Sequence, residues 1–167
     1  MSPFFFFNTI QNFKFTNNMR VSLVRKVKVP SRGTKKSAGI DFFVPEDLGS
    51  NFFRPLRVFR EGSLQDGFGI KLKPLESILI PSGVRAEVPE GFMLMGSDKS
   101  GIATKRGLLV GAKIVDEDYQ GEIHMHVINV SNFEAVIEPG DKLVQFILVP
   151  VDYQDVEVVC DCDMHKS

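Results

Sequence analysis

Short apolar runs separated by turn residues are the feature that most constrains this sequence. Runs rich in Val, Ile and Phe recur between Gly, Pro, Asn and Asp, whereas the 3.6-residue periodicity of amphipathic helices is scarce. The pattern is typical of an all-β domain, either a barrel or a sandwich. We expect strands at residues 21–29, 77–80, 83–88, 92–95, 123–129, 135–137 and 142–151.

We predict a single domain at residues 19–160. Residues 1–18 are low in charge and rich in Phe and Asn, so we interpret them as an N-terminal appendage, and residues 161–167 as a short polar tail. Residues 46–71 look like a long insertion between strands, which we expect to lie outside the shared core. Residues 100–106 are the best helical candidate, a short turn that needs neighbours to stabilise it.

Composition and charge exclude several classes of partner. The chain has 167 residues, of which 43% are hydrophobic and 25% charged, as in an ordinary globular domain. Twenty basic and 21 acidic residues leave a net charge of −1, so no overall field attracts nucleic acid or an anionic membrane. The apolar runs are shorter than the roughly 20 residues that span a bilayer. We therefore expect neither nucleic acid nor a membrane as a partner.

The termini bear on cellular location. Four phenylalanines at residues 4–7 follow no basic segment, and polar residues soon interrupt them, which argues against a secretion signal. Cys160 and Cys162 are too close in sequence to form a disulfide easily. With His165 they could hold a metal, but structural zinc normally takes four protein ligands, which favours an ordinary tail. We expect an intracellular protein, in the cytoplasm or, if viral, in the host cytoplasm.

Two segments are rich in residues that could take part in catalysis or ligand binding. Residues 111–122 read GAKIVDEDYQGE, where acids and a tyrosine follow an apolar pair. Such acids could project from a strand end into a cleft, although Asp and Gly are equally common in solvated turns. Residues 98–107 read DKSGIATKRG, and their hydroxyl, cations and backbone N–H groups could hold phosphate or simply form a surface turn.

Two further segments place single polar residues beside apolar ones. Residues 37–41 read SAGID and put Asp41 at the start of an apolar strand. Residues 140–150 read GDKLVQFILVP and put Gln145 inside an apolar run, where a buried amide must find hydrogen-bond partners. A hydrogen bond in the core would explain Gln145 without a site. His124 and His126 alternate on one predicted strand and so share a face, which favours surface or interface histidines over a catalytic pair.

Taken together, in this order and at these separations, the four segments resemble the first four motifs of the trimeric dUTPase family. SAGIDFF resembles the first motif, DKSGIA the second, GAKIVDEDYQGE the third and GDKLVQFILVP the fourth, while SGVRAEVPEGF resembles the stretch before the second. The resemblance covers about residues 21–159. It implies an all-β, dUTPase-like β-sandwich or distorted barrel of the β-clip type, with one short helical turn, in a homotrimer whose three sites lie between subunits.

The implied activity is that of a dUTP diphosphatase in nucleotide metabolism, which hydrolyses dUTP to dUMP and pyrophosphate. Mg²⁺ would be held by the triphosphate and by waters, with no direct protein ligand. Asp116 matches the base that orients and deprotonates the attacking water, a task suited to a carboxylate. Tyr119 matches the ring that packs under the deoxyribose and excludes a 2′-hydroxyl. Gly111 and Ala112 match the hairpin whose backbone binds the uracil edge.

The remaining implied contacts concern the phosphates. Lys99, Ser100 and Gly101 match the phosphate-binding second motif, and Gln145 matches the phosphate-contacting glutamine of the fourth. Asp41 matches the acid that supports the metal and phosphate region, often through water. Mg²⁺ would neutralise charge and bend the triphosphate for in-line attack.

Three departures from the family pattern lead to further expectations. The glycine-rich C-terminal arm that closes over the nucleotide has no counterpart in this sequence, which predicts slow turnover unless residues 1–18 or 46–71 close the site. Lys99 stands where the family usually has an arginine. The positive charge is kept, but the planar pair of donors that can bind two phosphate oxygens is lost. Lys113 replaces a glycine of the uracil hairpin, which leaves base specificity open.

Two alternatives stand beside the dUTPase interpretation. A dCTP deaminase-like relative would share the fold, but the stretch HMHVINV at residues 124–130 supplies no glutamate for a proton shuttle. A non-catalytic member could bind nucleotide or a protein partner, or serve structurally, without a lid. The presence of Asp116 and Tyr119 favours the enzyme over such a binding module.

Overall fold

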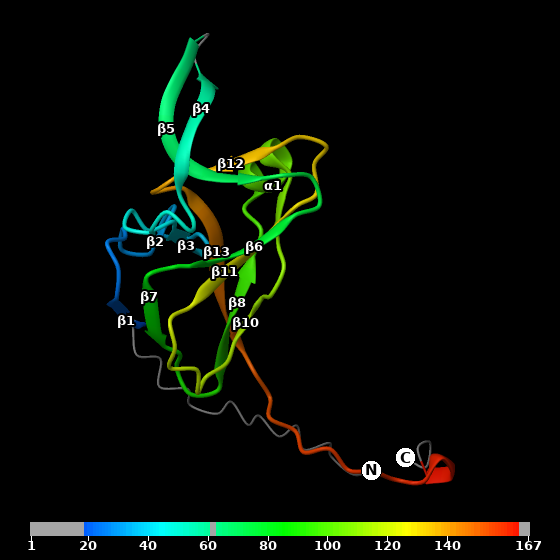
Figure 1. Ribbon diagram of the computed structural model, residues 1–167. Helices are drawn as coiled ribbons and strands as arrows, with labels where there is room; N and C mark the ends of the chain where they lie inside the picture. Colours follow the sequence, from blue (N-terminus) through cyan, green and yellow to red (C-terminus); the bar gives the residue numbers. More distant parts are fainter. Residues whose placement is uncertain (1–18, 61–62, 164–167) are drawn as a thin grey trace.

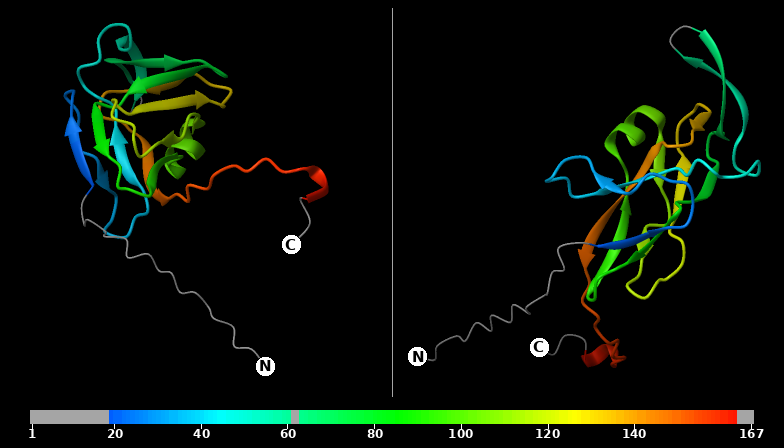
Figure 2. Two further views of the ribbon diagram at one scale, coloured as in Figure 1. Left: turned by 90° about the horizontal axis from the view of Figure 1, so that it is seen from below. Right: turned by 90° about the vertical axis from the view of Figure 1, so that its left-hand side faces the viewer.

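A computed structural model describes residues 19–60 and 63–163 of the chain. Short antiparallel strands surround one core, and the chain beyond the last strand extends away from it (Figures 1 and 2). The strands are β1 (Arg20–Leu23), β2 (Ser31–Arg32), β3 (Ile40–Phe43), β4 (Arg54–Arg60), β5 (Ser63–Leu72), β6 (Ser77–Pro81), β7 (Val84–Glu87), β8 (Phe92–Ser97), β9 (Leu108–Val110), β10 (Ile114–Val115), β11 (His124–Asn129), β12 (Ala135–Ile137) and β13 (Lys142–Pro150). Helix α1 spans Ser100–Arg106, and a 3-10 turn, η1, spans Asp161–Asp163.

The largest sheet, with strand order β10-β8-β13-β3-β2, brings distant parts of the sequence together. Strand β13 lies between β8 and β3, so Gln145 is paired with Ser97 on one side and with Asp41 on the other. Three of the segments singled out in the sequence therefore meet across one sheet.

The other sheets are smaller. One has the order β6-β11-β9, the second pairs β12, β5 and β4, and the third pairs β1 with β7. Burial alternates along β11, with Met125 and Val127 in the core and His124 and His126 on the opposite face. The expectation that the two histidines share a face is confirmed.

The core lies where the sheets face one another. Its largest fully buried side chains come from eight strands and from residues next to β3 and β11, and include Phe42, Ile80, Leu94, Ile123 and Met125. The rings of Phe42 and Phe146 lie 4.6 Å apart between centroids and are tilted by 55°, a favourable arrangement for aromatic pairs. Burial of this apolar surface is the main contribution to the stability of the domain.

The structure confirms the all-β class and most of the expected strands. Helix α1 has the predicted bounds, and it ends at Gly107, whose φ of 61° is left-handed. The predicted first strand, residues 21–29, is wrong beyond Leu23. After that residue the backbone forms hydrogen bonds with loop residues in place of a strand. Val24 N–H donates to the Gly83 carbonyl, and Lys26 N–H donates to the Asp47 carboxylate.

Residues 46–71 contain the β4–β5 hairpin, which projects from the body of the protein (cyan in Figure 1). The base of this segment packs into the hydrophobic core of the chain, whereas its place outside the core shared with the family stays a prediction. Phe53, Leu56 and Ile70 are buried there, whereas Phe68 is exposed. The hairpin is therefore anchored by its own apolar side chains.

The C-terminal segment leaves the sheet after β13 and ends in η1. Cys160 and Cys162 are exposed thiols, and the Cys162 thiol donates to the Cys160 sulfur at 2.8 Å. His165 and the appendage at residues 1–18 lie outside the described residues. In the described part of the chain, no three His, Cys, Asp or Glu side chains form a group that could hold a metal, and no helix is long and apolar enough to cross a bilayer.

Candidate active site

A carboxylate and two lysines form the most buried charged cluster of the structure. Asp41 lies on β3 and is buried, and its Oδ1 accepts a short hydrogen bond from Lys99 Nζ. Lys142 Nζ lies 3.5 Å from the other carboxylate oxygen, Oδ2. Asp41 therefore holds two cations beside the N-terminal end of α1.

Gln145 completes this carboxylate–lysine cluster from the neighbouring strand. Its amide nitrogen donates to the Asp98 carbonyl at 2.8 Å, which fixes the turn between β8 and α1. Asp98 itself accepts a hydrogen bond of 2.6 Å from Val110 N–H. Gly39 packs so closely on Gln145 that a Cβ there would overlap the glutamine amide. The hydrogen bond expected of a half-buried amide is present, and it links two of the predicted segments.

Ser100 and Gly101 lie in the first turn of α1 and are both exposed. Lys99 is the N-cap residue and makes no side-chain cap, because an ammonium group can only donate. It donates instead to Asp41. The structure thus brings five predicted residues into one region, namely Asp41, Lys99, Ser100, Gly101 and Gln145.

The connection between β9 and β10 lies where the sequence predicted the uracil hairpin, but the two strands pair with β11 and β8 and not with each other. A histidine of β11 holds this predicted hairpin. Gly111 N–H donates to the His126 carbonyl at 2.9 Å, and Ala112 N–H donates to His126 Nδ1 at 2.9 Å. Since Nδ1 accepts, the neutral ring carries its proton on Nε2. A side chain at residue 111 would overlap the imidazole ring, so glycine is required there.

A cavity of about 270 Å³ opens beside this hairpin. Ala112, Lys113, Asp116, Tyr119 and His124 line it, together with apolar side chains of the core. We call it the hairpin pocket. Asp116 and Tyr119 are both exposed in the single chain, so their polar groups are accessible to a ligand.

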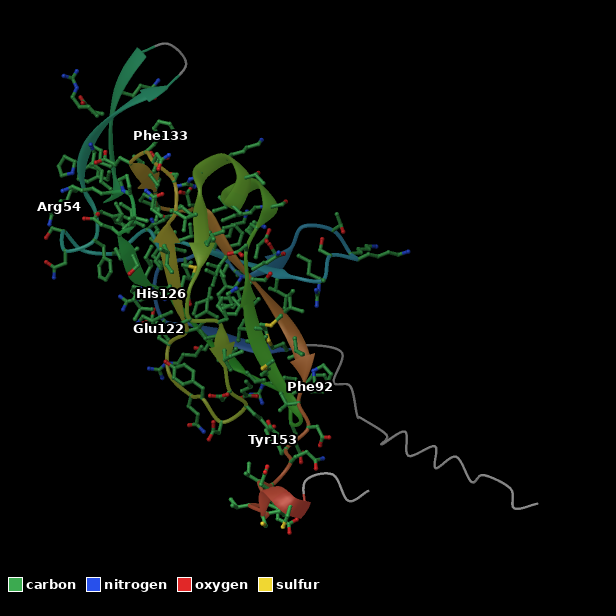
Figure 3. The ribbon with its side chains drawn as sticks, turned by 90° about the vertical axis from the view of Figure 1, so that its right-hand side faces the viewer. Arg54, Phe92, Glu122, His126, Phe133 and Tyr153 are labelled. Carbon is green, nitrogen blue, oxygen red and sulfur yellow. The ribbon has the colours of Figure 1, made fainter. Side chains whose placement is uncertain are left out.

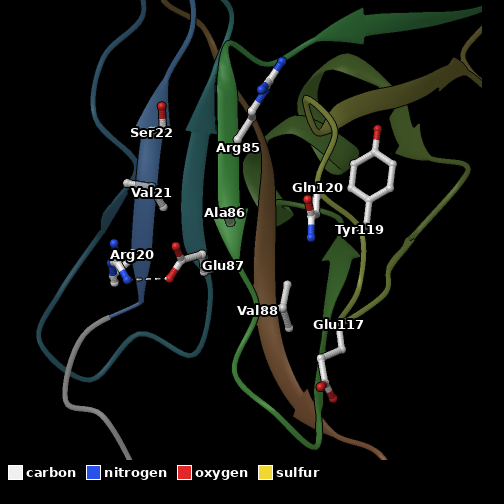
Figure 4. Close-up of a pocket in the computed structure, with 10 residues that line it drawn as sticks. All are labelled: Arg20, Val21, Ser22, Arg85, Ala86, Glu87, Val88, Glu117, Tyr119 and Gln120. Carbon is white, nitrogen blue, oxygen red and sulfur yellow. Dashed lines mark ion pairs between the residues drawn. The ribbon is translucent and has the colours of Figure 1, made fainter.

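A larger cavity of about 490 Å³ lies on another side of Tyr119. Figure 4 shows β1 and β7 along one wall and Glu117, Tyr119 and Gln120 along the other. The ion pair between Arg20 and Glu87, 3.1 Å long, lies across the two strands. Tyr119 therefore stands between two cavities and contributes to both.

Two glutamates that the sequence did not single out hold the loop that carries Asp116 and Tyr119. Glu117 accepts hydrogen bonds from Gly91 N–H at 2.7 Å and from the Tyr153 hydroxyl at 2.9 Å. The hydrogen bond to Glu117 raises the pKa of Tyr153 above its ordinary value, because only the protonated phenol can donate it. The first end of the loop is thereby fixed to two separate segments.

Glu122 fixes the second end. Its carboxylate receives Arg25 Nε at 2.7 Å, Arg25 Nη2 at 3.1 Å and Gly83 N–H at 2.7 Å. Burial raises the pKa of Glu122, but the bonds from Arg25 and Gly83 outweigh that effect, so its pKa lies below the ordinary value. Figure 3 labels Glu122, just before β11, and His126 on that strand.

The predicted site residues thus fall into two groups. One is the carboxylate–lysine cluster with the start of α1, and the other is the hairpin pocket with Gly111, Ala112, Asp116 and Tyr119. Within residues 19–60 and 63–163, no hydrogen bond or ion pair joins a cluster side chain to Asp116 or Tyr119. In the described residues of one chain, the predicted site residues therefore form two groups that no such bond joins.

Comparison with known proteins identifies the class of this fold and site. The sequence model of the dUTPase family matches residues 68–166. Two curated relatives are named deoxyuridine 5′-triphosphate nucleotidohydrolase. That of Aquifex aeolicus is 34% identical over 141 residues, covering 83% of this chain and 79% of the relative. That of Finegoldia magna is 33% identical over 156 residues, covering 89% of this chain and 95% of the relative.

Solved structures agree with the fold. The dUTPase from phage phi11 of S. aureus superimposes with a TM-score of 0.68 at 21% identity, covering 86% of this chain and 96% of that structure. A mutant of the phage phi11 dUTPase is described as coordinating a structural Mg(II) ion. The chain belongs to the dUTPase family.

Proposed function

We propose that the chain hydrolyses dUTP to dUMP and pyrophosphate. The observation that carries this proposal is the hairpin pocket, where Asp116, Tyr119 and the backbone of Ala112 line one cavity in a chain 34% identical to a deoxyuridine triphosphate nucleotidohydrolase. In this pocket the Asp116 carboxylate orients a water toward the α-phosphorus and accepts its proton. Tyr119 packs under the deoxyribose and leaves no room for a 2′-hydroxyl.

Base recognition follows from backbone groups that have no hydrogen-bond partner among the described residues. In the described residues the N–H of Ala112 is bonded to His126 and the carbonyl of Lys113 to Gly96 N–H, whereas the Ala112 carbonyl and the Lys113 N–H have no partner. One acceptor and one donor side by side complement the N3–H and a carbonyl of uracil. Cytosine presents an acceptor and an amine at these positions, so it would leave polar groups unpaired.

The carboxylate–lysine cluster binds the triphosphate in this proposal. Lys99, Ser100, Gly101 and Gln145 supply donors for phosphate oxygens. Both oxygens of Asp41 already face lysines, which fits a supporting acid better than a direct metal ligand. Mg²⁺ would accompany the substrate, held by phosphate oxygens and water, and would neutralise charge as pyrophosphate leaves.

We take the two groups, the hairpin pocket and the carboxylate–lysine cluster, as two half-sites of a homotrimer with three sites between subunits. Each site would take the hairpin pocket of one chain and the cluster of its neighbour, as a heterologous ring interface allows. We place the enzyme domain at residues 19–160, with residues 1–18 and 161–167 outside it and 46–71 as an insertion, in an intracellular protein. Light scattering should report three chains, and a monomer would contradict shared sites.

The activity is tested with a nucleotide panel. Pyrophosphate release from dUTP, dCTP, dTTP and UTP should be measured with Mg²⁺, together with ammonia release from dCTP. Asp116→Asn should reduce dUTP turnover about 100-fold or more, whereas Asp118→Asn, an exposed acid of the same loop, should retain it. Ammonia from dCTP would identify a deaminase-like relative, and no turnover of any nucleotide would identify a non-catalytic member.

Shared sites are tested by mixing inactive subunits. Asp116→Asn damages only the pocket, and Gln145→Leu damages only the cluster, so each homotrimer should be inactive. After co-refolding in equal amounts, a site is intact when an undamaged pocket meets an undamaged cluster, which occurs for about one quarter of random neighbours. Recovery of about a quarter of the parent activity is expected, and no recovery would contradict sites between subunits.

A further inference from the structure

Arg25 lies outside all four family-like segments, yet it makes a two-bond contact with the segment that forms the hairpin pocket. Its guanidinium group donates to both oxygens of Glu122, at 2.7 and 3.1 Å, across 97 residues of sequence. The contact is well shielded, because the Glu122 side chain is only 15% exposed. Such a fork between arginine and carboxylate restricts orientation as well as distance.

Glu122 connects this clamp to Tyr119 through its own backbone. The Glu122 carbonyl accepts the Tyr119 hydroxyl at 2.8 Å and also contacts His124 Nδ1 at 2.8 Å, with the ring nitrogen as donor. Gly121 packs against the phenol, since a Cβ there would lie 2.5 Å from its oxygen. The position of the Tyr119 ring therefore depends on where Glu122 is held.

No other charged side chain takes the place of Arg25 at this carboxylate within the described residues. The third contact to the Glu122 carboxylate is the Gly83 N–H, a neutral donor from the turn before β7. His124 is adjacent but uses the Glu122 carbonyl. Loss of Arg25 would leave the largely buried Glu122 carboxylate with one neutral donor. Moving that carboxylate toward water would then lower its free energy.

We propose that Arg25 is a positioning residue for sugar selection: by clamping Glu122 it holds the carbonyl that fixes Tyr119 beneath the nucleoside sugar. The inference rests on the proposed function for the identity of the substrate. Arg25 touches neither base nor phosphate, so it acts only through Glu122. Its removal should loosen the fit around the sugar and leave the attacking water and the phosphate cluster in place.

This mechanism predicts a specific kinetic pattern. Arg25→Gln should raise KM for dUTP and reduce the preference for dUTP over UTP about tenfold, with kcat changed less than about twofold. Arg25→Lys keeps the charge but not the fork, so its preference should be intermediate. Glu122→Gln keeps the carbonyl and loses the ionic clamp, so it should resemble Arg25→Gln.

The matched control is Lys26→Gln. Lys26 is the next residue and forms an ion pair of 2.8 Å with Glu46, but both side chains are largely exposed, at 76% and 53%. It should leave KM and sugar preference unchanged. Equal changes in Lys26→Gln and Arg25→Gln would show a general charge effect and overturn the proposal, as would an unchanged sugar preference in Arg25→Gln and Arg25→Lys.

A measurement independent of turnover separates this inference from the proposed activity. The chain has no Trp and only two Tyr, so the difference in fluorescence between the parent and Tyr119→Phe reports on Tyr119. Arg25→Gln should increase the acrylamide quenching of that difference signal, and Arg25→Lys should do so less. Should the parent hydrolyse no nucleotide, the proposed function fails, while unchanged quenching in both variants would refute the positioning role itself. If Arg25→Gln does not fold, Arg25→Lys and Glu122→Gln decide the same question.

Discussion

Replacing Asp41 with asparagine tests the electrostatic account of the carboxylate–lysine cluster. The Asp41 side chain is 5% exposed, that of Lys99 is 21% exposed and that of Lys142 is 51% exposed. A hydrogen bond to a charged group in such surroundings contributes about 1.5–3 kcal/mol. The longer contact to half-exposed Lys142 contributes about 0–1 kcal/mol because water screens it.

Asparagine keeps one acceptor oxygen but loses the charge. We therefore expect Asp41→Asn to lower the free energy of unfolding by about 2 kcal/mol, or the melting temperature by roughly 4–8 °C for a chain of this size. Urea denaturation at fixed protein concentration is the assay, since the proposed subunit assembly would make stability concentration-dependent. Glu46→Gln, which breaks the exposed pair with Lys26, is the control and should cost about 0.5 kcal/mol or less.

The two lysines should differ in the same assay. Lys99→Met leaves the buried carboxylate without its principal partner and should cost about as much as Asp41→Asn, whereas Lys142→Met should be close to neutral. Equal losses from Lys99→Met and Lys142→Met, or an Asp41→Asn loss no larger than that of the control, would refute the ranking by burial.

Other predictions address the contacts around each half-site. Gly39→Ala forces Gln145 away from Asp98, so KM for dUTP should rise about tenfold, measured by pyrophosphate release. Gly111→Ala drives a methyl group into the His126 ring and should weaken nucleotide binding, measured by calorimetry on the Mg²⁺–nucleotide complex. The lowered pKa of Glu122 means that its ion pair stabilises the fold above its ordinary pKa and is lost as pH falls through the lower, folded value. Melting temperatures between about pH 6 and pH 3 should therefore fall less steeply in Glu122→Gln than in the parent.

Local sequence patterns predicted the elements whose determinants are local. The bounds of α1 follow from a short run ended by Gly107, and β12 is bounded by turn residues on both sides. The predicted strand at residues 21–29 failed because its apolar residues could not reveal that β1 ends where the backbone meets Gly83. Strands β4 and β5 were missed because glycines at residues 67 and 69 resemble loop residues when their partner strand is unknown.

The candidate site also combines features with local determinants in the sequence and features that depend on distant residues. The resemblance of four contiguous segments to the family motifs singled out Asp41 and Lys99 of the cluster with neighbouring Gln145, and Asp116 and Tyr119 of the pocket, but not Lys142. The supports were not predictable in this way. Arg25 meets Glu122 across 97 residues, and Glu117 receives its donors from Gly91 and Tyr153. His126, which bonds to Gly111 and Ala112, was interpreted from its alternation with His124 only as a surface or interface histidine.

In the proposed trimer, the geometry of each half-site would be fixed within one chain, and assembly would bring the two half-sites together. The loop that carries Asp116 is fixed by a glutamate near each end, and the cluster is fixed by a buried carboxylate and by the amide of Gln145. Because both half-sites hold their geometry before they meet, bringing them together need not order either one. A substitution that weakens a support should consequently change substrate preference, whereas one that weakens assembly should reduce the number of working sites and leave the preference of each unchanged.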